Sequence, residues 1–576
     1  MTGGSGDSFD VVVLGSGAAG LAAALVAATE GLRVCLLEKA ALIGGTTAWS
    51  GGMVWAPGSG VAREAGYDDS PDAVQRYLTA LVPGAEQDSR MAAFLRAAPE
   101  AVDYLASRTQ VRLRPVPVYP DYYPELDGAT DGGRVLEPEP FDATVLGDDL
   151  KLLHLPLPEF ALFGDMMLAR PDIPHFRSFY KSPVSLLVAL RLLSRHSWQK
   201  IRYGRGTSLV LGNALVARFL VSLRSAGVVI RTEAEVAALI QDGDGAVQGV
   251  RLSQGGELEA RYGVVLATGG FTHDPSRRRR FLPGPLADNS ATAPGATGDG
   301  ARFAEAIGGQ FSEGATGNAF WAPVSRYTRP DGSTATYPHT VTDRAKPGLI
   351  AVNGQGRRFV NEAISYHAFV QAMLADHNTG AVPDAGAWLI CDAGFLWKYG
   401  LGAVKPMSLN RKGFKRQGYL VEAPSIEVLE DRLSLPAGDL VATVETYNRH
   451  ARTGSDPAFE RGSDSYQRFL GDPAQSPNPC IAPIEKPPFF AIKVRAGDLG
   501  SAAGLTTDET ARVLDDGGVP IPGLYAVGAD MRSVMEGSYP GPGITLGPAI
   551  AFAYLAAMDM VEKRLAAEGS TKPDPI

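Results

Sequence analysis

The sequence has few of the residues that bind metals or form disulfides. Its 576 residues include only three cysteines and eight histidines. Cys35, Cys391 and Cys480 lie far apart, and neither a CxxC pair nor a histidine cluster occurs. This spacing excludes a zinc-ligand motif and a disulfide framework, so we expect no metal site. It is also compatible with a reducing cytoplasm.

Excess positive charge and long apolar runs are missing as well. The formal net charge is −9, whereas a nucleic-acid-binding surface requires clustered lysine and arginine. No window of about 18 residues is both uncharged and strongly apolar, and the N-terminal MTGGSGDSFD has no basic region before its apolar strand. We therefore expect a cytoplasmic protein that does not bind nucleic acid and has no secretory signal or spanning helix. Its length allows two or more domains.

A glycine-rich turn near the N-terminus predicts a dinucleotide site. Residues 9–39, FDVVVLGSGAAGLAAALVAATEGLRVCLLEK, read as strand, turn, helix and second strand, and the turn matches GxGxxG. The first glycine permits the tight turn, the second lets a pyrophosphate approach the backbone, and the third lets helix and strand pack. The helix N-terminus favours phosphate, and the acid that ends the second strand can bind ribose hydroxyls. The predicted binding residues are Gly15, Ser16, Gly17, Ala18, Ala19, Gly20, Glu38 and Lys39.

The residues after this acid indicate which dinucleotide binds. Small and hydroxylated side chains fill KAALIGGTTAWSGG, residues 39–52, where the chain can run close along a flat ring system. This loop resembles the glutathione-reductase-like FAD proteins, especially the fumarate reductase/succinate dehydrogenase flavoprotein superfamily. VVLATGGF (264–271) and GLYAVGAD (523–530) resemble later FAD-domain strands of that superfamily. The resemblance implies FAD as cofactor, bound also by Gly44, Gly45, Thr46, Thr47, Ser50, Gly51, Gly52, Ala267, Thr268, Gly269, Gly270, Gly528, Asp530, Thr545 and Leu546.

The same resemblance implies the domain organisation. The fold class is α/β, with a Rossmann-like, glutathione-reductase-type FAD-binding domain built from discontinuous segments and an inserted α+β catalytic domain. We expect the FAD-binding domain at residues 7–311 and 488–572, and the catalytic domain at 312–487.

An apolar stretch at about 136–205 stands apart from the superfamily motifs. It is rich in proline and methionine, and the spacing of SLLVALRLL predicts an amphipathic helix followed by Arg191, Arg195 and Lys200. Three interpretations stay open: a subdomain packed on the FAD-binding domain, a mobile cover over an apolar site, or a patch resting on a membrane that dissolves a lipophilic substrate. The protein could therefore be membrane-associated.

Tyrosines occur where fumarate-type reductases would need arginines and histidines. They lie in PDYYPE (120–125), RRFVNEAISY (357–366) and YPGPGITLGP (539–548). With these motifs the chain resembles the 3-ketosteroid Δ1-dehydrogenases over nearly its whole length. The resemblance implies that Tyr366 takes the C2 proton of a cyclic 3-ketone and that Tyr122 hydrogen-bonds to Tyr366. Tyr539 and the N–H of Gly543 would hold the carbonyl oxygen in an oxyanion hole, which the neighbouring prolines stiffen.

The activity implied is FAD-dependent 1,2-desaturation of a 3-ketosteroid, with hydride transfer from C1 to flavin N5 and reoxidation by an external electron acceptor. A 3-ketosteroid Δ4-(5α)-dehydrogenase is the nearest alternative, and the motifs also allow a flavin dehydrogenase acting on another cyclic ketone. A fumarate- or urocanate-type reductase is a weaker alternative, because this sequence lacks the set of residues that would bind the substrate carboxylates. A flavin-binding sensor or electron-transfer subunit would not require the three tyrosines.

Overall fold

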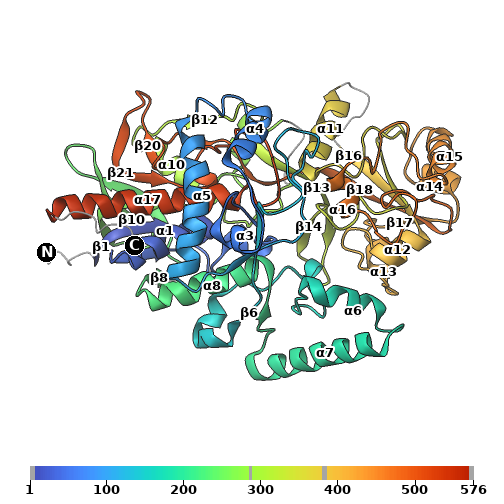
Figure 1. The fold of residues 1–576 in the computed structure, drawn as a ribbon, viewed down its shortest axis with the longest axis horizontal. Helices are drawn as coiled ribbons and strands as arrows, with labels where there is room; N and C mark the ends of the chain where they lie inside the picture. Colours follow the sequence, from blue (N-terminus) through green and yellow to red (C-terminus); the bar gives the residue numbers. More distant parts are fainter. Residues whose placement is uncertain (1–6, 284–288, 379–385, 570–576) are drawn as a thin grey trace.

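The computed structural model describes residues 7–283, 289–378 and 386–569, and it consists of two halves that each contain a sheet (Figure 1). Most of the yellow and orange segments form the second half. Within the described ranges, no helix combines the length and hydropathy needed to cross a bilayer.

The first half is built on an eight-stranded sheet with the predicted Rossmann-like core. Its central order is β20-β21-β11-β1-β2-β8, and β10 and β9 extend from β11. The β21-β11-β1-β2-β8 neighbours pair in parallel, as a strand–helix–strand unit requires. The strands are β1 (Asp7–Leu14), β2 (Val34–Leu37), β8 (Val229–Arg231), β9 (Val236–Gln241), β10 (Val247–Leu252), β11 (Glu257–Leu266), β20 (Arg512–Leu514) and β21 (Pro520–Ala526).

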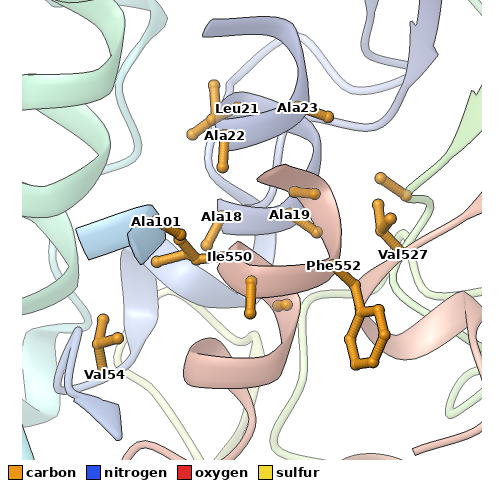
Figure 2. Packing of buried hydrophobic residues seen from close by; sticks show 14 of the residues in the cluster. Ala18, Ala19, Leu21, Ala22, Ala23, Val54, Ala101, Val527, Ile550 and Phe552 are labelled. Carbon is orange, nitrogen blue, oxygen red and sulfur yellow. The ribbon is translucent and has the colours of Figure 1, made fainter. Parts of the chain in front are cut away.

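Two helices rich in small residues pack together beside this sheet. Helix α1 (Ala18–Thr29) follows the glycine turn, and helix α17 (Leu546–Ala567) follows the last glycine-rich loop. Figure 2 shows Ala18 and Ala19 of α1 next to Ile550 of α17. Alanine lets two helices approach closely, so both helix N-termini reach the same region of the first half.

The second half is an antiparallel sheet flanked by short helices. Its order is β14-β13-β18-β16-β15, and β17 also pairs with β18. The strands are β13 (Ala319–Thr328), β14 (Thr334–Pro338), β15 (Leu349–Val352), β16 (Gly386–Asp392), β17 (Val421–Ala423) and β18 (Phe489–Ser501).

Strand β18 changes one expected domain boundary. The sequence motifs suggested a return to the FAD-binding domain at residue 488, but residues 489–501 form the middle strand of the second sheet. Its partners β13 and β16 begin about 170 and 100 residues earlier, and local sequence patterns carry no information on such pairing. Residues 570–572, the end of the predicted third segment, lie outside the described residues.

The apolar stretch at 136–205 forms a layer at one edge of the molecule, at the bottom of Figure 1. It contains helices α6 (Ile173–Ser178) and α7 (Pro183–Tyr203). The loop before α6 is joined to the second half, because Glu159 Oε1 accepts a hydrogen bond from Arg329 Nε at 2.8 Å. The layer therefore connects to the catalytic half and is not packed on the FAD-binding half alone.

Several shorter elements complete the described fold. The helices are α2 (Gly45–Trp49), α3 (Gly60–Glu64), α4 (Pro71–Leu81), α5 (Ser89–Arg108), α8 (Leu211–Ser225), α9 (Pro275–Phe281), α10 (Asp299–Glu305), α11 (Tyr366–Asn378), α12 (Ala393–Tyr399), α13 (Lys412–Arg416), α14 (Ile426–Arg432), α15 (Asp439–Ala451) and α16 (Ser465–Leu470). The strands are β3 (Val54–Trp55), β4 (Leu113–Pro115), β5 (Val135–Pro138), β6 (Phe141–Asp142), β7 (Ser208–Leu209), β12 (Phe311–Ser312) and β19 (Gly504–Leu505).

Candidate active site

One cavity of about 1190 Å³ extends along the two halves and the inserted layer. It begins at the glycine turn after β1 and reaches the predicted tyrosines. The predicted residues that line it are Gly15, Ser16, Gly17, Ala18, Ala19, Glu38, Lys39, Gly45, Thr46, Thr47, Ser50, Gly51, Gly52, Tyr122, Ala267, Thr268, Gly269, Tyr366, Gly528, Tyr539, Gly543, Thr545 and Leu546. The structure thus brings together residues that are more than 500 positions apart.

The glycine turn has the shape that a dinucleotide requires. Gly15 has φ +102°, and a Cβ there would lie 2.2 Å from the carbonyl oxygen of Ala267, so only glycine fits. A Cβ on Gly20 would lie 1.9 Å from the carbonyl oxygen of Gly15, which explains why this glycine packs in the turn and does not line the cavity. By contrast, a Cβ on Gly17 would meet only Thr47 Oγ1, at 3.8 Å, and one on Gly45 would meet nothing within 4 Å. These two positions leave open space beside the N-terminus of α1, where a pyrophosphate can approach the backbone.

The acid at the end of β2 is held at the cavity wall. Glu38 Oε2 accepts hydrogen bonds from the backbone N–H of Ser16 at 3.0 Å and from its Oγ at 2.5 Å, and Oε1 accepts from the N–H of Ala40 at 2.9 Å. Carboxylate oxygens have further lone pairs, so Glu38 can still accept from ribose hydroxyls. Lys39 Nζ next to it lies 2.7 Å from Asp299 Oδ2. The chemistry of this end of the cavity fits the ribose and pyrophosphate of FAD.

The predicted flavin loop is anchored from both sides. Thr47 Oγ1 accepts from the N–H of Ala18 at 3.0 Å, and Thr46 Oγ1 accepts from the N–H of Ala293 at 2.9 Å. Gly44, with φ +111°, sits behind the wall, where a Cβ would lie 2.9 Å from the Cβ of Ala48. The loop is therefore fixed close to the cavity by its own threonines.

Two further predicted contacts lie behind the wall. Asp530 is buried, and its carboxylate accepts from the N–H and hydroxyl of Thr268 and from the N–H of Gly270. Neither Asp530 nor Gly270 lines the cavity, whereas Gly528 and Gly269 do. Asp530 therefore shapes the loop that follows β11, and this position differs from the predicted direct approach to the cofactor.

Three predicted tyrosines meet at the other end of the cavity. The hydroxyl of Tyr366, the first residue of α11, donates to the hydroxyl of Tyr539 at 2.8 Å. The ring of Tyr122 lies 5.5 Å from each of the other two rings, edge-on to Tyr366 and stacked on Tyr539. The hydroxyl of Tyr122 is buried and has no hydrogen-bond partner in the described part of the chain. Tyr366 is thus hydrogen-bonded to Tyr539 in this arrangement, and the nearby Tyr122 hydroxyl lowers the pKa of Tyr366. The predicted hydrogen bond between Tyr122 and Tyr366 stays a prediction.

The loop that carries Tyr539 is rigidly attached to the first half. The carbonyl oxygen of Pro540 accepts from the N–H of Tyr122 at 2.9 Å and from the hydroxyl of Tyr77 at 2.6 Å. The carbonyl oxygen of Gly543 accepts from the N–H of Trp55 at 3.1 Å. Gly543 has φ +94°, and a Cβ there would lie 2.7 Å from the Trp55 nitrogen, so this position requires glycine.

Burial controls the protonation of the tyrosines. It raises the pKa of Tyr366 and of Tyr122 well above the ordinary phenol value. The neighbouring phenols add to the increase at Tyr122, whereas at Tyr366 the contact with Tyr539 adds to it and the hydroxyl of Tyr122 opposes it. Burial also raises the pKa of Tyr539 to about 12. At neutral pH Tyr539 is therefore a protonated hydrogen-bond donor, and any proton-abstracting phenolate here needs stabilisation from its surroundings.

The sequence motifs did not single out two residues beside these tyrosines, Tyr466 and His367. Tyr466 of α16 lies 4.9 Å, ring to ring, from Tyr122, but SYQRF matches no motif that singles it out. His367 lies 5.5 Å from Tyr539, and its Nδ1 accepts from the N–H of Trp321 at 3.1 Å. Burial lowers the pKa of His367 to about 3, so its imidazole is neutral.

Comparisons with known proteins agree with this site. A family model described as an FAD binding domain matches residues 10–546. The chain is 40% identical over 565 residues to the 4-oxocyclohex-2-ene-1-carboxylate 5-dehydrogenase of Sinomonas cyclohexanicum, covering 97% of this chain and 95% of that protein. It is 36% identical over 569 residues to the 3-oxosteroid 1-dehydrogenase of Mycolicibacterium smegmatis, covering 96% and 98%. The crystal structure of 3-ketosteroid Δ1-dehydrogenase from Sterolibacterium denitrificans in complex with 1,4-androstadiene-3,17-dione aligns with a TM-score of 0.89 and 35% identity. This alignment covers 97% of this chain and 100% of that chain.

The fold, the dinucleotide cradle and these matches define an FAD-dependent oxidoreductase that acts on CH–CH donors. FAD, which the residues of the cradle fit, is its cofactor. The chain belongs to the 3-ketosteroid Δ1-dehydrogenase family. The predicted fold class, cofactor and family are confirmed.

Proposed function

We propose that the protein introduces a C1–C2 double bond beside the carbonyl of a 3-ketosteroid, and that the hydroxyl pair of Tyr366 and Tyr539 carries the proton chemistry. The observation that carries this proposal is the 2.8 Å hydrogen bond between these two hydroxyls in the cavity wall. Tyr539 donates to the ketone oxygen, and the backbone N–H of Gly543 supplies a second donor. Two fixed donors stabilise the enolate that forms when C2 loses its proton.

Tyr366 then removes the C2 proton. A general base must be unprotonated, and burial opposes the phenolate form of Tyr366. The nearby Tyr122 hydroxyl reduces this cost, because it lowers the pKa of Tyr366 and can donate to Tyr366 once that residue has lost its proton. The single hydroxyl proton of Tyr539 stays with the ketone oxygen. The ring of Tyr122 keeps water away from the pair. FAD, when bound, accepts the hydride from C1, and an external acceptor reoxidises it.

The shape and lining of the cavity support a lipophilic ring system as substrate. Its volume exceeds what a steroid needs, which leaves room for the cofactor beside it. The inserted layer contributes a largely apolar wall to the cavity, and relatives in the family are named as 3-oxosteroid 1-dehydrogenases. The apolar lining residues are Leu157, Phe160, Leu162, Phe163, Met166, Met167, Ile173, Phe176 and Phe179.

Anaerobic addition of androst-4-ene-3,17-dione tests this function. We expect the yellow FAD absorbance of the holoenzyme to bleach, because the C1 hydride reduces the bound flavin. Turnover with an artificial electron acceptor, followed by product analysis, should place the new double bond at C1–C2. A C4–C5 double bond formed from a 5α-reduced ketosteroid would instead indicate the Δ4 activity. Unchanged absorbance across a panel of 3-ketosteroids would refute the proposal.

A second part of the proposed function is peripheral contact with a membrane through helix α7. The orientation of this helix is the reverse of that expected for a surface helix: Ser185, His196 and Gln199 are buried, whereas Leu187 is 67% and Ile201 87% exposed. The inward polar groups are satisfied within the layer, for example by the 2.8 Å hydrogen bond from Gln199 Nε2 to Ser208 Oγ. An outward apolar face of this kind is typical of a helix that lies in a lipid interface.

The charge of this segment favours an anionic lipid surface. Residues 181–205 contain no aspartate or glutamate, although the whole chain has a net charge of −9. Basic side chains near a membrane are each attracted to anionic headgroups. The basic residues of the segment are Lys181, Arg191, Arg195, Lys200, Arg202 and Arg205. Since the same layer lines the cavity, a substrate dissolved in the lipid could enter from this side.

Changing Leu187 and Ile201 together to serine should reduce binding to vesicles that contain phosphatidylglycerol by about tenfold or more, because two exposed apolar side chains no longer enter the interface. Co-sedimentation at low ionic strength measures the bound fraction. Leu409→Ser is the matched control, since Leu409 is 84% exposed but lies outside the layer. Equal binding of the double variant and the wild type would contradict the membrane contact.

A further inference from the structure

Two arginines on the cavity wall share a single carboxylate. Arg114 of β4 donates to Glu137 Oε1 through Nη2 at 2.9 Å, and Arg170 donates to Glu137 Oε2 through Nε at 2.7 Å. Glu137 is 5% exposed, and all three side chains line the cavity. Two guanidinium groups against one carboxylate leave one surplus positive charge facing the cavity.

The unused donors of these arginines remain available. Across the residues described, the two Nη nitrogens of Arg170 and Nη1 of Arg114 donate no hydrogen bond. The side chains are 40% and 43% exposed, so they can still turn toward a ligand. A guanidinium fork of this kind binds planar oxyanions in a bidentate manner. The hydrogen bond from Nε to Glu137 already restrains the Arg170 side chain, so less conformational entropy is lost when a ligand binds.

A buried tyrosine ring lies beside the same guanidinium. Tyr119 is 3% exposed and lines the cavity, and the Cζ of Arg170 lies 5.9 Å from the centre of its ring. Its hydroxyl makes no hydrogen bond to any described part of the chain. Tyr119 precedes Tyr122 by three residues. The pKa of Tyr122 is raised mainly by burial and further by neighbouring phenols, of which Tyr119 is one. The arginine pair is therefore close to the tyrosines of the proposed chemistry and distant in the chain from the glycine turn.

We propose that Arg170, Arg114 and Tyr119 form a binding site for a carboxylate carried by the ketone substrate. This inference rests on the proposed function, because the ketone oxygen must first be placed at Tyr539. In a six-membered ring, a carboxylate opposite the ketone lies roughly 6 Å from the carbonyl oxygen by ordinary bond lengths. The site thus selects a cyclic keto acid. A 4-oxocyclohexanecarboxylate has its carboxylate at this short distance from the ketone oxygen, whereas a 3-ketosteroid with an acidic side chain has it beyond the far end of four fused rings.

Paired acid and ester substrates test the site. With purified holoenzyme, the substrates are 4-oxocyclohexanecarboxylate and its methyl ester, and 3-oxochol-4-en-24-oic acid and its methyl ester. We expect the enzyme to prefer one acid over its ester, and Arg170→Gln to lower kcat/KM for that acid by about 10- to 100-fold, the range for losing a hydrogen bond between charged groups. The ester should change by no more than about twofold. The preferred acid identifies which of the two sources the site serves.

Controls separate a binding role from a general defect. Arg96→Gln removes an exposed arginine of α5 that does not line the cavity, and it should leave all rates unchanged. Arg114→Gln should repeat the acid-specific loss if Arg170→Gln folds poorly. Equal losses for acid and ester, or an ester preference in the wild type, would overturn the carboxylate site. If none of these ketones bleaches the flavin, the proposed function and this inference both fail. If only 4-oxocyclohexanecarboxylate bleaches it, the carboxylate site stands and the 3-ketosteroid substrate is wrong. If neutral ketones alone bleach it, only this inference fails.

Discussion

Replacing Tyr366 by phenylalanine should lower the rate of anaerobic flavin bleaching by about 10²- to 10⁴-fold, the usual effect of removing a general base. The ring packs among Tyr122 and Tyr539 in the wild type and can keep these contacts in the variant. Only the hydroxyl that donates to Tyr539 is lost. Stopped-flow absorbance with a saturating ketosteroid measures the reductive step directly.

The pH dependence gives a second readout for the same residue. Burial raises the pKa of Tyr366 above the ordinary phenol value, so below that pKa the unprotonated fraction increases about tenfold per pH unit. The wild-type kcat/KM should therefore rise with pH through the neutral and mildly alkaline range, and this rise should disappear in Tyr366→Phe. Tyr447→Phe is the control, because Tyr447 is buried in the same half, its hydroxyl has no hydrogen-bond partner among the described residues, and it does not line the cavity. Unchanged turnover in Tyr366→Phe with full FAD content would remove Tyr366 from the mechanism.

Tyr539→Phe should lower kcat by about 10²- to 10³-fold, as expected when one donor of an oxyanion hole is removed. The variant keeps the aromatic ring that packs against Phe320 and Tyr122, but it cannot hydrogen-bond the ketone oxygen. Enolate formation should be slower because one of the two donors to the oxyanion is missing.

Exchange of the C2 hydrogens of the ketone with deuterated water, followed by NMR, isolates this step. We expect Tyr539→Phe to slow the exchange in parallel with kcat. Tyr466→Phe should leave the exchange nearly unchanged, because the Tyr466 hydroxyl lacks a hydrogen-bond partner in the described structure and does not line the cavity. If exchange remains fast in Tyr539→Phe while bleaching is slow, Tyr539 acts after proton removal and the oxyanion assignment is wrong.

The parts of the fold and site that depend on local sequence could be predicted. The strand, turn and helix around Gly15 follow from an apolar run and glycine spacing within about 30 residues, and the structure has them at Asp7–Leu14 and Ala18–Thr29. The end of the cavity that contains Tyr366 and Tyr539 could be predicted from the sequence for a similar reason. Each of these tyrosines belongs to a short motif with its own composition, so the resemblance could be carried over residue by residue.

What could not be predicted depends on contacts between distant segments. The sequence of β18 predicts a strand but does not indicate to which half it belongs. Only its pairing with β13 and β16 assigns it to the second sheet. Asp530 was expected at the cofactor because it ends a motif, but tertiary packing turns its carboxylate toward Thr268. Arg114 and Arg170 are separated by 55 residues, and their shared partner Glu137 reveals the pair only in three dimensions.

The hydrogen bond between the hydroxyls of Tyr366 and Tyr539 joins the two halves of the molecule. Tyr539 belongs to a loop fixed to the first half by Tyr77 and Trp55, whereas Tyr366 begins a helix that packs on the sheet of the second half. Under the proposed mechanism, a displacement of one half against the other would separate acid from base and would interrupt both roles at once. The proposed chemistry therefore requires the arrangement of the two halves described here.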